Sequence, residues 1–230
     1  MPHTFKAVIF DLDDTLYDCS GTLVHSRRLR ASKVIAGAIG CSEKEAYELQ
    51  LDLDRQKAPD GDPYKAIARK HSLPESFLKD VNKAFSEVGI SGIKPFAGVT
   101  DTLKDLKNKG LTLFLVTVGR HKEQEEKVQA LGLEGLFDEI VILDAGEAGS
   151  EAKKTGFRDI LDRHGLRPEE VLCVGDRMDR ELKVAKELGI HTVMVKHGRH
   201  YERFISGSAV EEKPDMYIEN VANLPGVLSR

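Results

Sequence analysis

The sequence predicts an α/β fold in which a parallel sheet is interrupted by an inserted helical segment. Short runs rich in Val, Ile and Leu alternate with helical patterns, which is typical of strands joined by right-handed crossovers. Three carboxylates, Asp11, Asp13 and Asp14, directly follow the first apolar run. Between residues 18 and 92 the sequence has helical patterns and no convincing strand.

The expected strands are short and almost entirely apolar, which suits strands that are buried on both faces. They cover Ala7–Phe10, Leu111–Val116, Ile140–Leu143, Val171–Val174, Thr192–Val195 and Met216–Ile218. The helices expected between them lie near residues 98–109, 121–131, 155–164, 179–188 and 221–228.

Two charged segments of this core have simple interpretations. The run Lys122–Lys127 pairs opposite charges four residues apart, which indicates a solvated helix face. Basic residues gather late in the chain, and His-x-x-His alone is a weak metal signal without a helix or a third ligand, so a polar surface loop is expected there. These residues are His197, Arg199, His200 and Arg203.

The segment 18–92 predicts a helical cap inserted after the first strand, with residues 1–17 and 93–230 forming the catalytic core. Apolar residues with a helical period run from Ala31 to Ile39, and Gly40 follows as a stop signal. Ser42 and Glu45 form a capping-box pattern. The run Ala58–Pro63 is a turn cluster. Pro74 suits the first position of a further helix, which Gly89 is expected to end. An insertion beside an acidic strand end is best explained as a lid over a site.

The composition excludes several classes of protein. The 230 residues are 40% hydrophobic and 31% charged, with a net charge of −4 and no long basic run, which argues against nucleic acid as the main partner. Cys19, Cys41 and Cys173 are scattered, so they fit neither a disulfide framework nor a zinc site and favour a reducing, cytoplasmic compartment. We expect neither a signal peptide nor a membrane span, and the oligomeric state is open.

The acidic turn after the first strand predicts a magnesium site. Carboxylates packed this closely raise one another's pKa values unless a cation neutralises them. Mg²⁺ takes one or two carboxylates and leaves room for a substrate phosphate. Asp11 is expected to be a nucleophile that accepts a phosphoryl group, and Asp13 to be the general acid and base.

Three later segments supply partners for these acids. Thr117 and Val118 end an apolar strand, where a hydroxyl and backbone amides bind phosphoryl oxygens. Lys153 or Lys154, leading into a helix near residue 155, offsets negative charge. Asp176 follows another strand and is expected to be a second metal ligand facing Asp11. The acids after it either hold metal-bound waters or are ordinary acids of a first helical turn, and they are Asp179 and Glu181.

With these segments the chain resembles the haloacid-dehalogenase superfamily of phosphohydrolases. Asp11-Leu-Asp13-Asp14-Thr15-Leu16 is similar to its first motif, Thr117 to its second, Lys153 or Lys154 to its third and Gly175-Asp176 to its fourth. The resemblance implies a Rossmann-like core and a type 1 helical cap. It also implies Mg²⁺ bound by the Asp11 carboxylate, the Asp13 backbone carbonyl and Asp176. The spacing to Asp176 in members that lack a proline after the lysine selects Lys153, with Lys154 left open.

The resemblance implies a phosphatase acting on a small phosphorylated metabolite, because dehalogenating members lack a carboxylate at the position of Asp13. A phosphomutase shares these motifs, and so does a phosphonate-cleaving enzyme, which needs a cap lysine, such as Lys33 or Lys57, for a Schiff base. A non-catalytic binding protein is the alternative from another class. Candidate substrate-reading residues follow the first motif, and they are Tyr17, His25, Arg28 and Arg30.

Overall fold

The computed structural model describes residues 5–56, 62–144, 149–206 and 212–228. Contacts divide the chain into two compact units, residues 1–19 with 92–230 and residues 20–91. These bounds lie one or two residues from the predicted ones.

The larger unit contains a six-stranded parallel sheet. The strands are β1 (Ala7–Phe10), β2 (Thr112–Val118), β3 (Glu139–Leu143), β4 (Val171–Gly175), β5 (His191–Val195) and β6 (Met216–Ile218). They lie in the order β3-β2-β1-β4-β5-β6, and every neighbouring pair is parallel. This is the strand order of a Rossmann-like sheet, in which the winding direction reverses between β1 and β4. The predicted α/β fold is therefore confirmed.

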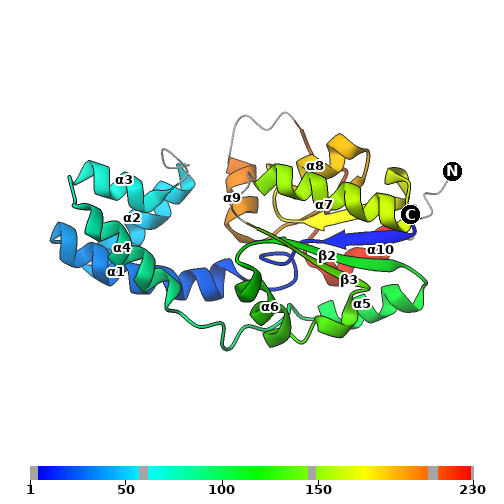
Figure 1. Ribbon diagram of the computed structural model, residues 1–230, viewed down its shortest axis with the longest axis horizontal. Helices are drawn as coiled ribbons and strands as arrows, with labels where there is room; N and C mark the ends of the chain where they lie inside the picture. Colours follow the sequence, from blue (N-terminus) through cyan, green and yellow to red (C-terminus); the bar gives the residue numbers. More distant parts are fainter. Residues whose placement is uncertain (1–4, 57–61, 145–148, 207–211, 229–230) are drawn as a thin grey trace. The chain divides into compact units, whose positions relative to one another are not determined.

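Helices cover both faces of this sheet (Figure 1), with α7 and α8 on one face and α5 and α6 on the other. Six α-helices of this unit lie in the described residues: α5 (Val99–Asn108), α6 (His121–Ala130), α7 (Gly149–His164), α8 (Glu181–Leu188), α9 (Gly198–Ser206) and α10 (Leu224–Leu228). Short 3₁₀ turns occur at Glu134–Leu136, Pro168–Glu170 and Val221–Asn223.

Alternate residues of β1 enter two separate apolar layers, as the two-residue period of a strand requires. Ala7 and Ile9 pack in a cluster with residues of α7 and α8, including Phe157 and Leu182. Phe10 points to the opposite face of the sheet and meets Phe137 edge-on, with ring centroids 6.0 Å apart. Both faces of the strand are buried, which explains its uninterrupted apolar sequence.

Two predictions for this unit need correction. Helix α7 begins at Gly149 rather than near residue 155, so both candidate lysines lie within a helix. The basic segment predicted as a loop contains helix α9, and that prediction was wrong. Its aromatic residues Tyr201 and Phe204 lie one turn apart and pack against the apolar cluster between the sheet and α7. The charged residues of this segment, including Glu202 and Arg203 between the two rings, mask this periodicity in the sequence.

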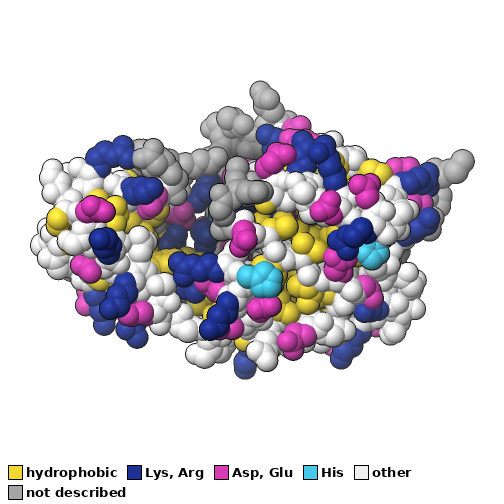
Figure 2. Space-filling view, in the orientation of Figure 1, with side chains coloured by type: hydrophobic (Ala, Val, Ile, Leu, Met, Phe, Trp, Pro, Cys, Tyr) yellow, Lys and Arg dark blue, Asp and Glu magenta, His cyan; other side chains and the backbone are white. Residues whose placement is uncertain are grey.

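The charged surface carries both signs. Figure 2 shows basic and acidic side chains intermixed on the drawn face, with neither sign forming one continuous patch. In the described part of the chain, no helix combines the length and apolar character that a bilayer crossing needs.

The smaller unit is helical, as predicted. A π-helical turn (Ser20–Val24) leads into α1 (His25–Ile39), α2 (Glu43–Arg55), α3 (Pro63–Lys70) and α4 (Glu75–Ser86). Gly40 ends α1 in the left-handed conformation, with φ of 74°. Pro74 caps α4 instead of occupying its first position, and the helix ends before Gly89. Most of the predicted turn cluster, residues 58–61, lies outside the described residues.

Its core combines apolar packing with one polar network. Ile35, Ile67 and Phe77 are buried in one cluster with residues of all four helices. Gln50 is also buried, and its side-chain amide nitrogen donates to Ser32 Oγ at 2.8 Å. The Tyr64 hydroxyl donates to the side-chain oxygen of Gln50, Oε1, at 3.2 Å. Because these buried polar groups have partners, the network adds specificity without leaving unpaired groups.

The predicted capping box of α2 is present, and its removal gives a simple test. Ser42 Oγ accepts from the Glu45 amide, and the Glu45 carboxylate accepts from the Ser42 amide. Replacing Ser42 with alanine leaves a helix-terminal amide without its partner, so we expect the unfolding free energy of this unit to fall by about 1 kcal/mol. Urea denaturation followed by circular dichroism measures it. Lys44→Ala, on the same exposed turn, should show no comparable loss.

Candidate active site

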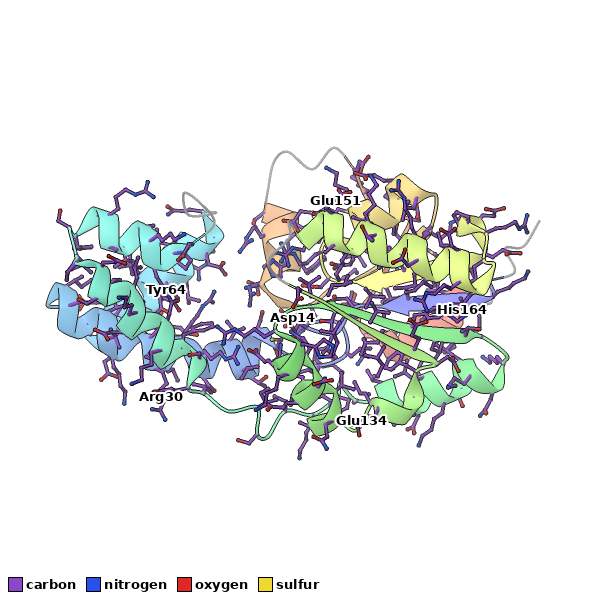
Figure 3. The ribbon with its side chains drawn as sticks, viewed as in Figure 1. Asp14, Arg30, Tyr64, Glu134, Glu151 and His164 are labelled. Atoms are coloured by element: carbon purple, nitrogen blue, oxygen red, sulfur yellow. The ribbon has the colours of Figure 1, made fainter. Side chains whose placement is uncertain are left out.

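The first motif occupies the turn that leaves β1 at the centre of the sheet. The Asp11 amide donates to the Val174 carbonyl at 3.0 Å, which extends the β1–β4 ladder by one bond. The chain then turns tightly, with the Leu16 amide on the Leu12 carbonyl and Asp14 in the left-handed region at φ of 58°. In Figure 3, Asp14 lies at the end of the sheet beside α9, while His164 lies at the opposite end. The motif therefore opens at the carboxyl ends of the strands, where this fold class binds ligands.

Three buried carboxylates meet at this edge. Oxygens of Asp11, Asp176 and Glu181 all lie within 4.8 Å of one another. Asp176 directly follows β4, and Glu181 is the first residue of α8. Asp176 Oδ2 is buried and has no hydrogen-bond partner among the described residues. Three acids with an unsatisfied buried oxygen form a donor set that suits a hard divalent cation.

Burial and mutual repulsion dominate the electrostatics of these acids. Burial, opposed by Lys153 and reinforced by Glu181, raises the pKa of Asp11 to about 7. Burial, together with Glu181 and Asp11, raises the pKa of Asp176 well above its usual range. A bound cation reverses this preference because it favours the ionised carboxylates.

Lys153 is the lysine that reaches the acids. Its ammonium is buried, donates to Asp11 Oδ1 and lies 3.2 Å from Glu181 Oε2. Although burial disfavours the ammonium, Asp11 and Glu181 raise the pKa of Lys153 above its usual range, so it stays charged. Lys154 instead pairs with Glu187 at 2.7 Å on the outer side of α7. Successive helical residues point about 100° apart, so one helix cannot direct both lysines to one site.

The two acids after Asp176 have different surroundings. Glu181 is buried, and its Oε1 accepts from the Arg177 amide at 2.8 Å. Asp179 is mostly exposed and pairs with the Arg177 side chain at 3.1 Å. Gly175 makes room for Glu181, because a Cβ atom there would lie 2.6 Å from Glu181 Cγ. Glu181 is therefore the acid that stands beside Asp11 and Asp176.

The second motif ends β2, and a glutamine of α6 accompanies it. Thr117 is buried, and its hydroxyl donates to Gln124 Oε1 at 3.4 Å. The Gln124 amide in turn donates to the Val118 carbonyl at 3.5 Å. Gly119 permits this approach, because a Cβ atom there would lie 2.2 Å from Gln124 Nε2. Sequence reasoning did not identify Gln124 as a neighbour of the site.

Lys127 contradicts the prediction that Lys122–Lys127 is entirely a solvated face. Its ammonium lies 3.0 and 2.9 Å from the two carboxylate oxygens of Asp13, and its side chain is only 4% exposed. Gln124, Lys127 and Val128 form the buried side of α6. With Leu131 they follow the helical period of a buried stripe, and that period was the sequence signal for Lys127.

Asp13 is therefore held differently from Asp11. Besides Lys127, the Tyr17 hydroxyl donates to its Oδ1. Burial opposes ionisation of Asp13, but Lys127 and the Tyr17 hydrogen bond outweigh it and lower the pKa of Asp13. Tyr17, predicted as a substrate-reading residue, thus contacts an acid of the site itself.

Several other candidates from the sequence have partners of their own. In the helical unit, His25 bonds the Tyr47 hydroxyl at 2.7 Å and Arg28 pairs with Asp54 at 2.7 Å. Arg30 and Lys33 are exposed residues of α1, and Lys57 lies outside the described residues. In the larger unit, His197 Nε2 lies 3.1 Å from Asp18 Oδ1. Burial lowers the pKa of His200, and the positive charge of Arg177 lowers it further.

Comparison with known proteins matches this chain to a family of hydrolases. The haloacid dehalogenase-like hydrolase family matches residues 8–195. Glyceraldehyde 3-phosphate phosphatase of Methanothermobacter thermautotrophicus is 31% identical over 83% of this chain and 85% of its own length. Phosphoglycolate phosphatase of Aquifex aeolicus is 28% identical over 84% and 85%, respectively.

A solved structure gives the same fold. The crystal structure of a predicted phosphoglycolate phosphatase from Haemophilus somnus superposes with a TM-score of 0.71, at 22% identity over 97% of this chain and 98% of that one. The chain belongs to the haloacid dehalogenase-like hydrolase family. Within it the chain is a phosphatase that hydrolyses phosphomonoesters.

Proposed function

We propose that this phosphatase acts on a small phosphorylated metabolite with Mg²⁺, using Asp11 as the nucleophile and Asp13 as the general acid and base. The observation that carries the proposal is that two nearby carboxylates, Asp11 and Asp13, have different charged and hydrogen-bonding partners. Asp11 lies among buried acids and Lys153, while Asp13 is held by Lys127 and Tyr17. Two carboxylates in contrasting environments are a common basis for two distinct catalytic roles.

Each role follows from the residue's chemistry. An Asp11 oxygen attacks phosphorus, and the bond to the leaving oxygen breaks. In its protonated form Asp13 gives that oxygen a proton, and as the resulting carboxylate it later takes a proton from the water that cleaves the aspartyl-phosphate. The lowered pKa of Asp13 favours the carboxylate that this second step requires. Lys153 would offset negative charge beside Asp11, and the Thr117 hydroxyl would donate to a phosphoryl oxygen.

The donor set fits Mg²⁺. The Asp11 and Asp176 carboxylates and the Asp13 backbone carbonyl would hold the ion, with Glu181 as the adjacent acid and Asp179 a more distant one. When bound, Mg²⁺ neutralises charge on the phosphoryl group and keeps the acids ionised. The unpartnered Asp176 oxygen supports this assignment.

The relatives suggest a short phosphorylated aldehyde or acid as substrate, because their names specify glyceraldehyde 3-phosphate and phosphoglycolate. A contribution of the helical unit to substrate choice stays a prediction.

Metal removal tests the proposal directly. We expect phosphate release from glyceraldehyde 3-phosphate, 2-phosphoglycolate or an aryl phosphate in the presence of Mg²⁺. Chelation with EDTA should reduce the rate at least about a hundredfold, because it removes a major source of electrostatic stabilisation, and added Mg²⁺ should restore it. Inorganic phosphate is measured colorimetrically after the EDTA has been dialysed away.

Two outcomes would contradict it. Hydrolysis that persists unchanged through chelation would exclude the metal assignment. Interconversion of phosphorylated isomers without phosphate release would instead indicate a phosphomutase.

A further inference from the structure

Lys127 is a buried cation to which the proposed mechanism assigns no role. It lies on α6, and its ammonium spans both oxygens of the Asp13 carboxylate at 3.0 and 2.9 Å. A further acid of the same helix, Glu123, lies 3.8 Å away. Burying a lysine costs hydration and side-chain freedom, so such a contact persists only where a specific anion compensates for the loss.

The contacts of Lys127 fix the orientation of Asp13 as well as its charge. Two bonds from one ammonium hold both carboxylate oxygens, and the Tyr17 hydroxyl adds a third bond at Oδ1. Tyr17 is itself fully buried, so its hydroxyl is a fixed donor. A carboxylate has roughly four acceptor positions, so these three bonds occupy most of them and restrict how the Asp13 side chain can turn.

The separation from the other lysine is also informative. Lys153 of α7 reaches Asp11, and Lys127 of α6 reaches Asp13, so each acid has its own cation. Without Lys127, the Asp13 carboxylate would lose the cation that spans both of its oxygens.

We propose that Lys127 is a positioning residue that, with Tyr17, holds the Asp13 carboxylate in the orientation from which it exchanges a proton with the leaving oxygen and with water. This inference rests on the proposed role of Asp13. Lys127 acts through Asp13 and does not itself touch the phosphoryl group.

The rates with two different leaving groups distinguish positioning of Asp13 from a purely structural role of Lys127. An alkyl phosphate needs a proton on its departing oxygen, whereas an aryl phosphate departs readily without one. Lys127→Met preserves length and removes the charge. We expect kcat for the alkyl phosphate to fall about 10- to 100-fold, a fraction of what general acid catalysis contributes, with KM little changed. The fall for the aryl phosphate should be clearly smaller.

Three further variants make the comparison decisive. Lys127→Arg retains a cation that reaches both oxygens and should recover most of the alkyl rate. Tyr17→Phe keeps the packing, removes one bond and should show a weaker loss in the same direction. Lys122→Met is the matched control, because Lys122 lies exposed on the same helix beside Glu126 at 3.9 Å, and it should behave as the unaltered protein.

The outcomes separate this inference from the proposed function. If Asp13→Asn hydrolyses the alkyl phosphate normally, the role of Asp13 is wrong. If Asp13→Asn is inactive but Lys127→Met hydrolyses both substrates normally, or loses both equally, positioning by Lys127 is wrong. If Lys127→Met does not fold, Tyr17→Phe decides: a selective alkyl loss supports the proposal, and unaltered or equally reduced rates overturn it.

Discussion

Asp11→Asn is expected to abolish phosphate release, with kcat lowered at least about a thousandfold, as for removal of other covalent nucleophiles. The amide has nearly the shape of the carboxylate but cannot form the acyl-phosphate bond. The assay is steady-state hydrolysis of an aryl phosphate with Mg²⁺, at a protein concentration that allows the residual rate to be measured.

The same substitution should leave the fold intact. Burial raises the pKa of Asp11 to about 7, so above that pH the folded protein is penalised for carrying the ionised group. The neutral amide removes this penalty, and its thermal midpoint in EDTA at pH 8 should equal or exceed that of the unaltered protein. Asp105→Asn, at an exposed position of α5, is the control and should keep full activity. Normal hydrolysis by Asp11→Asn would exclude Asp11 as the nucleophile.

Lys153→Met is expected to impair both stability and catalysis. Its ammonium is the cation between Asp11 and Glu181, and removing it leaves buried carboxylates facing one another. Loss of one partner of a buried pair costs about 3–5 kcal/mol, and we expect a loss of this size in EDTA. Loss of one electrostatic stabiliser should lower kcat about 100- to 1,000-fold with Mg²⁺ present.

Lys154→Met supplies the matched control from the adjacent position. Its pair with Glu187 lies at the surface, so its removal should cost at most about 1 kcal/mol and leave kcat unchanged. Urea denaturation measures the first quantity and phosphate release the second. The reverse pattern, with Lys154→Met inactive and Lys153→Met normal, would contradict the proposed role of Lys153.

Local patterns were sufficient to predict most of the core. The strand at Ala7–Phe10 is four consecutive apolar residues, a run typical of a doubly buried strand, and its bounds were predicted correctly. The capping box at Ser42 was also predicted, because its bonds join residues three positions apart. Such features depend on near neighbours in the chain and need no knowledge of the fold.

Helix α9 and Lys127 show where this reasoning failed. In α9, charged residues surround the two aromatic side chains that pack on the core, so the segment has the composition of a loop. On α6, the i,i+4 pair of Glu123 and Lys127 is typical of a solvated face, and the pair exists at 3.8 Å. Lys127 is nevertheless buried against Asp13, which lies 114 residues earlier in the chain.

By itself, the sequence determined the fold class, the strand positions and the family resemblance, since each depends on short-range residue patterns. Only the tertiary structure decided which charged side chains are buried together. It placed Glu181 rather than Asp179 beside Asp176 and Lys127 on Asp13, and it put Lys153, which the spacing had favoured over Lys154, on Asp11. The physical reason is that the energy of a charge depends on what surrounds it in space, and for these residues the partners come from distant parts of the chain.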